Sequence, residues 1–391
     1  MVPQAIKFDT QPLLHRTTRR KWLTQTSASA FLNDRERRRI QENNMKLVTG
    51  VGGWPSQAPA QAKKAEENGY DVISCGELSH DSILTMALAG QATDKIDLLT
   101  SVTIAFPRSP MVLAMESWDI QQMTGGRFNI GLGSQVKGHN ERRFGGTWSA
   151  AAPRMKEYIQ MMKAVWDSWQ EGTTPEFIGK EYRYTLMTPN FNPGPLEVPK
   201  PKVYLAVVGP AMARVAGEVA DGVLPHGGIM TDKYMRETLL PNVKIGLDRS
   251  GRTWDDIDIS MSGYLILGDD DDEIYANLQK LRTPLSFYGS TRSYHHVLRL
   301  HGLEELGLKL HALSLEGRWK EMQEVITDDD LFTLAETCKY DDYAEFVSSN
   351  REYASQMGFG METKTDEQKA RAQDLMRQLQ AVKTTGVPAG L

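Results

Sequence analysis

The chain has 391 residues, of which 40% are hydrophobic and 24% charged, and its formal net charge is −5. This composition is usual for a globular protein, and the negative charge argues against a nucleic-acid partner. No run of about 18 apolar residues occurs, so no membrane span is expected. The chain holds only Cys75 and Cys338, which indicates neither disulfides nor a zinc site and favours a reducing, cytoplasmic location.

Residues 1–44 differ from the rest because they are rich in Arg, Ser and Thr and show no alternation of strand and helix patterns. We predict a disordered N-terminal extension, followed by a domain that begins at Met45. A targeting segment is the alternative, although Trp22–Asn33 is too polar for the apolar part of a secretory signal.

From Lys46 onward, short apolar runs rich in β-branched residues alternate with helical patterns. The predicted strands are Lys46–Val51, Asp71–Gly76, Asp97–Ala105, Arg127–Gly133, Lys202–Val208, Gly222–His226, Asp258–Leu267 and Met357–Met361. Such strands form a parallel sheet that helices cover on its outer side. Because no G-x-G-x-x-G motif follows the first strand, the pattern favours a closed (β/α)8 TIM barrel over a doubly wound sheet.

Helices are predicted between these strands and after the last one. They are Ala58–Asn68, Ser82–Thr93, Pro110–Met123, Pro153–Trp169, Pro210–Ala220, Thr231–Arg249 with a break at Pro241, Asp269–Leu281, Asp342–Tyr353 and Asp366–Val382. Two insertions interrupt the alternation, at about residues 171–201 after strand four and 284–331 after strand seven. The barrel is therefore expected over residues 45–362, with a C-terminal helix and tail over 363–391.

In a TIM barrel the chemistry takes place at the carboxyl ends of the strands. The loop after the fourth strand carries a dense group of donors and cations there. They are Ser134, Gln135, Lys137, His139, Asn140, Arg142 and Arg143. Such a group suits a phosphate or an electron-rich ring edge, and a merely solvated loop is the alternative.

Two other strand ends carry candidate residues. Glu77 and His80 follow the second strand and are general acid–base candidates, unless His80 only neighbours the residues that cap the next helix. Val208 and Gly209 lead into a helix N-terminus, which is either an anion site or a plain turn. His295, His296 and His301 lack metal-ligand spacing, so no metal site is expected.

Three of these segments together resemble the bacterial-luciferase-like flavin and deazaflavin oxidoreductases. They are TSVTIAFPRSP (100–110), RFNIGLGSQVKGHNERRFG (127–145) and VGPAMARVAGEVADG (208–222). The chain is most similar to a subgroup that depends on coenzyme F-420, a deazaflavin. The resemblance implies a luciferase-type TIM barrel, a homodimer, and a non-proline cis peptide bond at Ser101–Val102 that backs the central ring of the cofactor.

The same resemblance implies which residues form the site. Together with Arg142 from the donor-rich loop, it gives the predicted cofactor-binding residues Glu77, Ser101, Val102, Ser134, Gln135, His139, Arg142, Ala206, Val207, Val208 and Gly209. The predicted catalytic residues are the acid–base candidates Glu77 and His80, which rest on their place after the second strand. The family often has a histidine directly after the acidic residue, whereas this chain has Leu78 there and His80 two residues later.

These observations predict an oxidoreductase that uses coenzyme F-420 for hydride transfer to or from a small, apolar organic substrate. One alternative is an FMN-dependent monooxygenase that uses O2 and receives reduced flavin from a partner reductase. Another is a flavin-binding protein without turnover. The donor-rich loop and the long second insertion, which is placed to form a lid, favour an enzyme.

Overall fold

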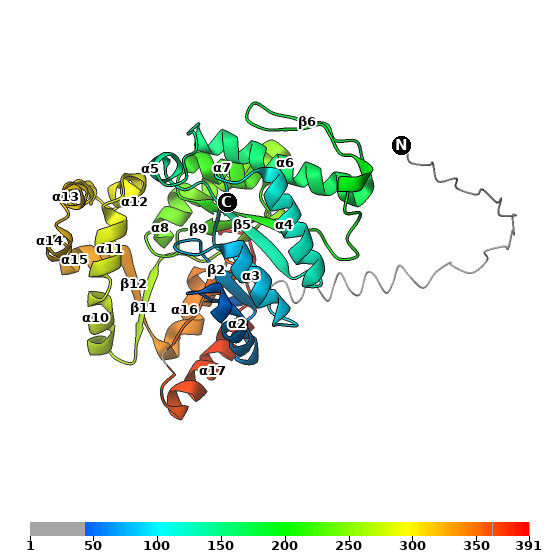
Figure 1. The fold of residues 1–391 in the computed structure, drawn as a ribbon. Helices are drawn as coiled ribbons and strands as arrows, with labels where there is room; N and C mark the ends of the chain where they lie inside the picture. Colours follow the sequence, from blue (N-terminus) through cyan, green and yellow to red (C-terminus); the bar gives the residue numbers. More distant parts are fainter. Residues whose placement is uncertain (1–43, 362, 391) are drawn as a thin grey trace, which may run out of the picture. The chain divides into compact units, whose positions relative to one another are not determined.

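The computed structural model describes residues 44–361 and 363–390, so nearly all of the predicted N-terminal extension lies outside the described residues. Asn43–Leu391 form one compact unit. Within it, helices surround a central parallel sheet, and a second group of helices lies on one side of the barrel, coloured yellow and gold in Figure 1.

The barrel strands follow the predicted order. They are β1 (Lys46–Gly50), β2 (Val72–Cys75), β3 (Asp97–Thr100) with its continuation β4 (Thr103–Ile104), β5 (Phe128–Gly133), β8 (Lys202–Val207), β9 (Gly222–Pro225), β10 (Asp258–Ile259) and β13 (Gln356–Gly358). Neighbouring strands pair in the order β10-β9-β8-β5-β3-β2-β1-β13. A parallel bridge between Ser260 and Gln356 joins the two ends of this sheet. The predicted TIM barrel is confirmed.

Helices cover the outside of the barrel and start at recognisable signals. They are α2 (Ala58–Glu67), α3 (Ser82–Gln91), α4 (Pro110–Met123), α6 (Ala151–Glu171), α7 (Pro210–Val219), α9 (Leu240–Ser250), α16 (Tyr343–Asn350) and α17 (Asp366–Ala381). The Asp81 carboxylate accepts the backbone N–H of Leu84 at the start of α3, and Pro110 occupies the first turn of α4. Both residues suit the first turn of a helix.

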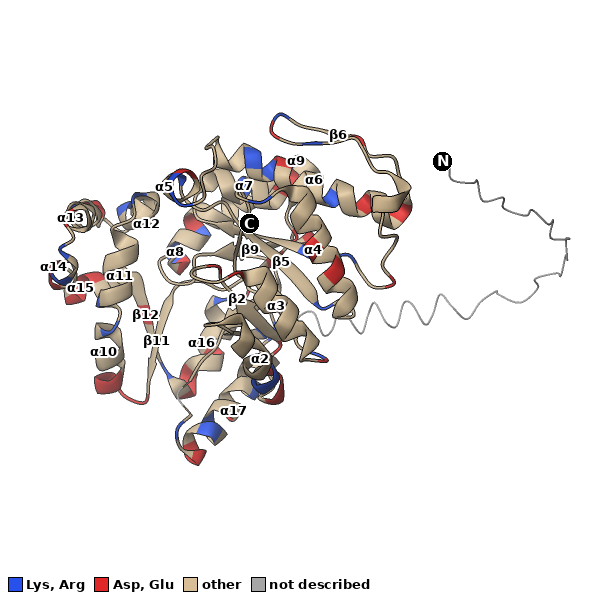
Figure 2. Ribbon diagram, viewed as in Figure 1, with Lys and Arg blue, Asp and Glu red and all other residues tan. Residues whose placement is uncertain are grey.

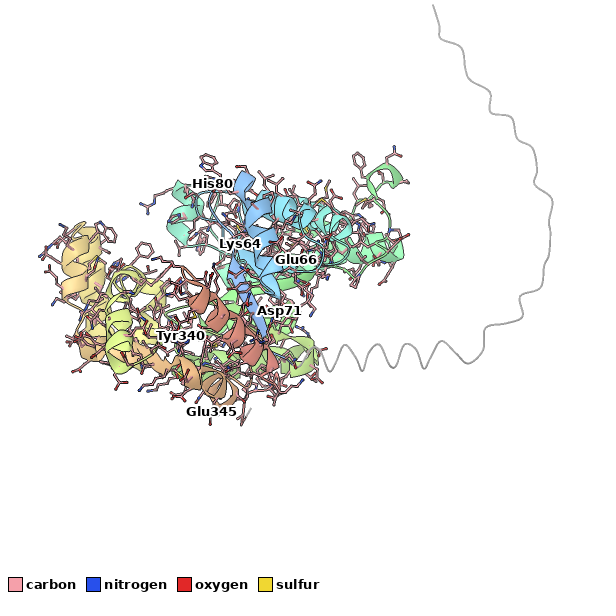
Figure 3. The ribbon with its side chains drawn as sticks, turned by 90° about the horizontal axis from the view of Figure 1, so that it is seen from below. Lys64, Glu66, Asp71, His80, Tyr340 and Glu345 are labelled. Atoms are coloured by element: carbon pink, nitrogen blue, oxygen red, sulfur yellow. The ribbon has the colours of Figure 1, made fainter. Side chains whose placement is uncertain are left out.

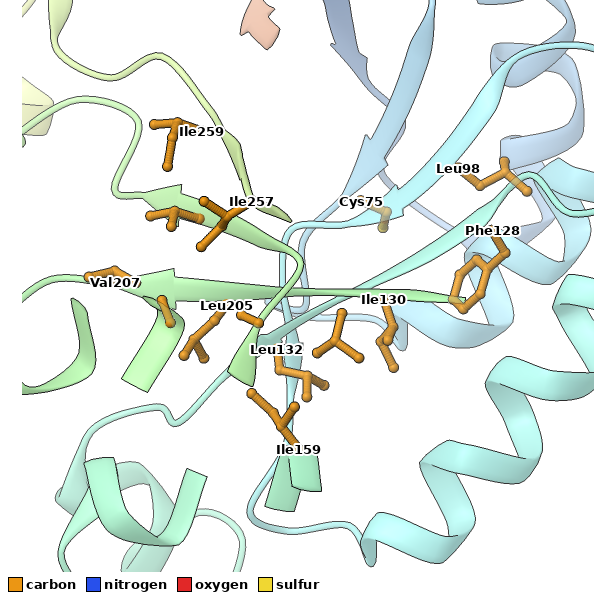
Figure 4. Close-up of a cluster of buried hydrophobic side chains, with 14 of the residues drawn as sticks. Cys75, Leu98, Phe128, Ile130, Leu132, Ile159, Leu205, Val207, Ile257 and Ile259 are labelled. Carbon is orange, nitrogen blue, oxygen red and sulfur yellow. The ribbon is translucent and has the colours of Figure 1, made fainter. Parts of the chain in front are cut away.

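Two apolar clusters explain why the strands are nearly continuous hydrophobic runs. Outward-facing side chains such as Ile130, Leu132 and Leu205 pack against the helices in the main core (Figure 4). A smaller cluster of Val72, Leu99, Tyr204 and Leu224 fills the barrel interior. Parallel strands are therefore buried on both faces. Charged side chains gather on the surrounding helices and loops (Figure 2).

The prediction of one seventh strand over Asp258–Leu267 is wrong. The barrel strand β10 ends at Ile259, and the apolar run after Gly263 forms β11 (Tyr264–Gly268). Gly263 has a φ of +100°, which turns the chain away from the barrel. β11 pairs instead with β12 (Ala335–Lys339), a strand that the sequence analysis did not predict.

The segment between β11 and β12 is helical and has its own core. Its helices are α10 (Asp271–Gln279), α11 (Arg282–Gly289), α12 (His295–Leu300), α13 (Glu304–Leu315), α14 (Trp319–Glu324) and α15 (Asp328–Leu334). Leu285, Leu298, Leu310 and Leu331 are among the residues of a separate apolar cluster. The earlier insertion contains a short hairpin of β6 (Phe177–Ile178) and β7 (Arg183–Tyr184).

The predicted helix break at Pro241 does not occur. α8 (Asp232–Tyr234), the π-turn η3 (Met235–Leu239) and α9 follow one another without interruption. Proline cannot donate the backbone hydrogen bond of a regular helix. The wide π-turn directly before Pro241 changes that bonding pattern and lets the helix continue. In the described part of the chain, no helix is both long and apolar enough to span a membrane.

Candidate functional site

We call the region at the carboxyl ends of the barrel strands, together with the loops that follow them, the bowl. Several glycines lie at or just after the ends of β1, β8, β9 and β13, and a Cβ atom added to them would meet no atom within 4 Å. They are Gly50, Gly52, Gly209, Gly227, Gly358 and Gly360. A flat ligand can approach backbone closely where side chains are missing. The bowl lies at the end of the barrel where TIM-barrel enzymes hold their substrates.

A bulge between β3 and β4 forms part of the floor of the bowl. The Ser101–Val102 peptide bond is cis, as predicted. A Cβ atom on Gly133 would lie 2.5 Å from Cγ2 of Val102 and 3.9 Å from Cβ of Ala206. The structure therefore brings Ser101, Val102 and Ala206, three of the predicted cofactor residues, together around the end of β5.

Glu77 supports this bulge from beside it. Its backbone N–H donates to the Val102 carbonyl at 3.2 Å, and its carboxylate accepts the Ile104 N–H at 2.6 Å. Arg108 donates to both carboxylate oxygens, at 2.9 Å and 2.5 Å. The Glu77 side chain is only 9% exposed. Both oxygens of the Glu77 carboxylate are therefore already bonded, and its acid–base role stays a prediction.

Arg108 was noted in the sequence only as part of a motif, yet it links two acidic groups. It also donates to the Asp81 carboxylate at 2.6 Å. Burial opposes the charge of Arg108, but the hydrogen bonds and charges of Glu77 and Asp81 raise its pKa overall. Burial also raises the pKa of nearby Glu116, although the charge of Arg108 opposes that rise.

The donor-rich loop after β5 is held by Asn140, which was predicted only as one of its ligand-binding donors. Asn140, on α5 (Lys137–Arg142), is buried and donates to the carbonyls of Ser134 and Val136 at 2.9 Å and 3.1 Å. Gln135 has a φ of 54°, and its side-chain oxygen accepts the Val136 N–H at 2.9 Å. Because a buried amide needs hydrogen-bond partners, Asn140 stabilises the loop, a role that depends on burial and could not be read from the sequence.

Two of the predicted cofactor-binding residues of this loop lie on its surface. His139 and Arg142 are exposed, and Arg142 folds back so that one guanidinium nitrogen lies 2.8 Å from where a Cβ on Gly138 would be. Arg143 instead donates to the Leu78 carbonyl at 2.7 Å. This hydrogen bond joins the loops that follow β5 and β2.

The predicted catalytic residue His80 lies at the periphery. Figure 3 shows it at the outer edge of the molecule, away from Tyr340 and Glu345. Its ring packs against the exposed ring of Trp54, with a centroid distance of 4.5 Å. In the described residues, the next acidic residue, Asp81, serves as the cap of α3.

Val207 is a wrong prediction for the cofactor site. Its side chain is completely buried in the core between the barrel and the helices (Figure 4). Side chains alternate between the two faces of a strand, so Ala206 and Val208 face the interior instead. The Val208 carbonyl accepts the Tyr234 hydroxyl at 3.1 Å and lies 3.1 Å from Nε2 of His296.

His226 is a candidate at a predicted strand end to which the sequence analysis assigned no role. It follows β9 by one residue and shares the inward face with Leu224. Its ring packs against Tyr288 at 4.3 Å and Tyr294 at 5.2 Å between centroids. Both tyrosines come from the long insertion. The alternation of side chains along the strand was the available signal, because a polar residue on the inward face just past the strand end borders the bowl.

A separate hollow lies between α10, β12 and α16, outside the barrel. Thr337, Cys338, Lys339 and Asp342 are among its lining residues. None of the predicted site residues lines it. No group of His, Cys, Asp and Glu within the described ranges is arranged to hold a metal ion.

The fold is a TIM barrel, and the comparison with known proteins defines its class. A family model for luciferase-like monooxygenases matches residues 41–356, which is most of the chain. The chain therefore belongs to the luciferase-like monooxygenase family and is an oxidoreductase of the luciferase-like type.

Individual relatives agree with this family. An uncharacterised protein of Mycobacterium tuberculosis is 38% identical over 291 residues, covering 74% of this chain and 85% of that protein. The F-420-dependent glucose-6-phosphate dehydrogenase of Gordonia bronchialis is 28% identical over 280 residues, covering 68% and 79%. The solved structure of the coenzyme F-420-dependent tetrahydromethanopterin reductase of Methanopyrus kandleri has a TM-score of 0.66 at 19% identity, covering 87% and 98%.

Proposed function

We propose that this protein uses coenzyme F-420 for hydride transfer to or from a small, apolar organic substrate. The observation that carries the proposal is the floor of the bowl, where the bulge at Ser101–Val102 meets Gly133 and Ala206. The relatives support a flavin or deazaflavin cofactor, and the F-420-dependent enzyme of Gordonia bronchialis favours the deazaflavin.

The described residues fit a planar ring system. Ser101, Val102 and Ala206 would lie beneath the ring, and the absence of a side chain at Gly209 leaves room at the start of α7. Ser134, Gln135, Val208, His139 and Arg142 would border its polar side or its tail. When bound, the deazaflavin supplies a ring carbon that gives or takes a hydride, and the protein supplies placement.

Glu77 acts in this proposal as a positioning residue. It holds both sides of the bulge, through the Val102 carbonyl and the Ile104 N–H, while Arg108 balances its charge. His80 is left without a defined partner apart from Trp54. We therefore place proton handling on the opposite wall of the bowl, beside His226.

The alternative within the same family is a monooxygenase that uses reduced FMN and O2. The family description favours it, and the same bowl would serve it. That enzyme would need a separate reductase to supply the reduced flavin. A homodimer remains part of either proposal, and a cofactor carrier without turnover is the third possibility.

Cofactor titrations test these proposals. Purified protein is titrated separately with F-420 and FMN while tryptophan fluorescence is followed. We expect F-420 to bind at least about tenfold more tightly, a difference of about 1.4 kcal/mol. Tighter binding of FMN would contradict the F-420 assignment, and binding of neither would refute the cofactor site.

A variant pair localises the binding to the bowl. Gly209→Glu places a charged side chain in the open space at the start of α7 and should abolish F-420 binding. Gln122→Glu adds the same charge near the far end of α4, where the side chain is exposed, and should leave the affinity unchanged. Equal affinities for the two variants would show that the cofactor binds elsewhere.

A further inference from the structure

One wall of the bowl is aromatic and poor in charge. His226 after β9 packs against Tyr288 in a T-shaped arrangement, and against Tyr294. Tyr288 and Tyr294 also pack against each other, with centroids 6.2 Å apart. The three residues come from two elements far apart in sequence, the end of a barrel strand and the inserted helices.

The hydrogen bond to the His226 ring indicates which ring nitrogen carries the hydrogen. The Gly228 N–H donates to Nδ1 at 3.4 Å, so the neutral ring carries its hydrogen on Nε2. Burial lowers the pKa of His226, which keeps the ring neutral at pH 7. The Ser262 hydroxyl donates to the His226 carbonyl at 2.7 Å and fixes the backbone there.

Tyr294 adds a second neutral donor. Burial, followed by the neighbouring Tyr288, raises the pKa of Tyr294 to about 12, so the hydroxyl keeps its proton. The pKa values of His226 and Tyr294 are shifted by burial and by nearby aromatic or backbone groups. No carboxylate or cation is among the causes of these shifts. The wall therefore offers hydrogen-bond donors without a net charge.

We propose that Nε2 of His226 and the hydroxyl of Tyr294 bind the carbonyl oxygen of a neutral ketone or aldehyde with apolar substituents. This inference rests on the proposed function, because hydride transfer needs such an acceptor. Two neutral donors stabilise the negative charge that develops on a carbonyl oxygen as its carbon accepts a hydride. Apolar rings favour apolar substituents, and a charged substrate would find no counter-ion on this wall.

The reduction balances as follows. A reduced deazaflavin, when bound, would supply the hydride that the carbonyl carbon accepts and would itself be oxidised by two electrons. A C–H bond forms, and the π electron pair of the C=O bond moves to oxygen. Tyr294 gives its proton to that oxygen and regains one from water, while His226 keeps its proton and donates a hydrogen bond. The product is the alcohol, and the same groups serve its oxidation in reverse.

The experiment observes the carbonyl directly, without turnover. Acetophenone labelled with 13C at the carbonyl is added to protein and oxidised F-420, where no hydride can be transferred. Hydrogen bonding should move the carbonyl 13C signal of the bound probe downfield. We expect His226→Leu to remove most of this shift, Tyr294→Phe to reduce it, and His226→Gln, which keeps an N–H donor, to restore part of it.

Each result decides the proposal. No binding of acetophenone by the wild type, or the same shift in His226→Leu, would overturn it, as would loss of the shift in His80→Leu alone. Sodium benzoate should not displace the probe, because its carboxylate finds no cation. If His226→Leu does not fold, the 13C shifts of His226→Gln and Tyr294→Phe are compared with that of the wild type. Wild-type shifts in both variants would overturn the proposal.

The F-420 affinity of each variant separates this inference from the proposed function. We expect unchanged F-420 binding in Tyr294→Phe together with a fall of about 100-fold in single-turnover hydride transfer to acetophenone. If the wild type fails to bind F-420, the proposed function fails, while the 13C shift measured without cofactor still tests the donor pair. Normal F-420 binding with an unchanged shift in the variants refutes only the donor pair.

Discussion

Arg108 shows how one side chain can organise the floor of the bowl. Its guanidinium bonds both Glu77 and Asp81. Glu77 in turn holds the two sides of the bulge, while Asp81 caps α3. A planar guanidinium with several donors suits such a shared contact better than an ammonium group does. The geometry of the bulge thus depends on a residue that would not itself touch the cofactor.

We predict that Arg108→Met lowers the free energy of unfolding by roughly 3 kcal/mol, because it leaves the nearly buried Glu77 carboxylate without its cation. Urea denaturation followed by circular dichroism measures the change. The double variant Arg108→Met with Glu77→Gln should recover part of the loss, since the uncompensated charge is gone. An unchanged urea midpoint in the single variant would contradict this account.

The alternation of side chains between the two faces of a strand explains which site residues could be predicted. Ala206 and Val208 share the inward face of β8 and stay predicted cofactor residues, whereas the side chain of Val207 between them is buried toward the helices. Strict alternation along β8 would have excluded it. His226 could have been found by the same rule, whereas its contacts with Tyr288 and Tyr294 depend on a distant insertion and no local pattern reports them.

At the scale of elements, β3 and β5 approach each other closely. Thr100 accepts the Gly131 N–H through its hydroxyl at 2.8 Å and donates that hydroxyl to the Gly131 carbonyl at 2.9 Å. A Cβ on Gly131 would collide with the Thr100 carbonyl and would lie 2.8 Å from Cδ1 of Leu224. Glycine is therefore required on the inward face of β5.

We predict that Gly131→Ala destabilises the protein by about 3 kcal/mol, because the backbone of β3 cannot move aside as a flexible side chain would. Thermal unfolding measures the change. Gly358→Ala is the matched control, since a Cβ there meets no atom within 4 Å. Similar melting temperatures for the two variants would refute the close approach of β3 and β5.

A second link joins η3 to the segment that precedes β13. Arg236 donates to both carboxylate oxygens of Glu352 at 2.9 Å. These hydrogen bonds lower the pKa of Glu352 from 4.5 to about 2. The folded pKa is below the unfolded one, so the stabilisation is complete above about pH 4.5 and is lost as the pH falls toward 2.

We therefore expect the wild type to lose more stability between pH 5 and pH 2 than Glu352→Gln, which has no carboxylate to protonate. Urea unfolding at several pH values across this range provides the comparison. Arg236→Gln should behave like Glu352→Gln, because it removes the partner. Parallel stability curves for wild type and Glu352→Gln would show that this pair does not contribute.

The order of the barrel strands could be predicted because each is a short apolar run between helical patterns. The seventh strand failed for a physical reason, because Tyr264–Gly268 is as apolar as a barrel strand. Only the turn at Gly263 and the pairing with Ala335–Lys339 direct it elsewhere. A local sequence pattern contains no information about a strand partner that lies far along the chain, and a single glycine does not mark the end of a strand.

For the whole molecule, the compact unit begins at Asn43. We predict that a chain starting at Asn43 keeps the melting temperature and F-420 affinity of the full chain. Differential scanning fluorimetry and the fluorescence titration measure both. A clear fall in either would show that the preceding residues contribute to the fold or to the site.

The other end of the chain should behave differently. In α17 the side chains of Leu375, Met376 and Leu379 are buried, and Gln380 donates to the Asp71 carboxylate at 2.8 Å. Removing residues 363–391 removes these contacts and exposes the apolar surface that α17 covers, so we expect little soluble, folded protein. Full solubility and an unchanged melting temperature would contradict the role of α17 in covering the barrel.

The inserted helices form a unit whose entry and exit strands, β11 and β12, are hydrogen-bonded partners, and the unit has its own apolar cluster. Evolution, or an engineer, can therefore exchange this unit between related barrels by cutting near Gly263 and Tyr340. Such a graft would replace Tyr288 and Tyr294 but leave the floor at Ser101–Val102 untouched. The choice of substrate would then be inherited separately from the choice of cofactor.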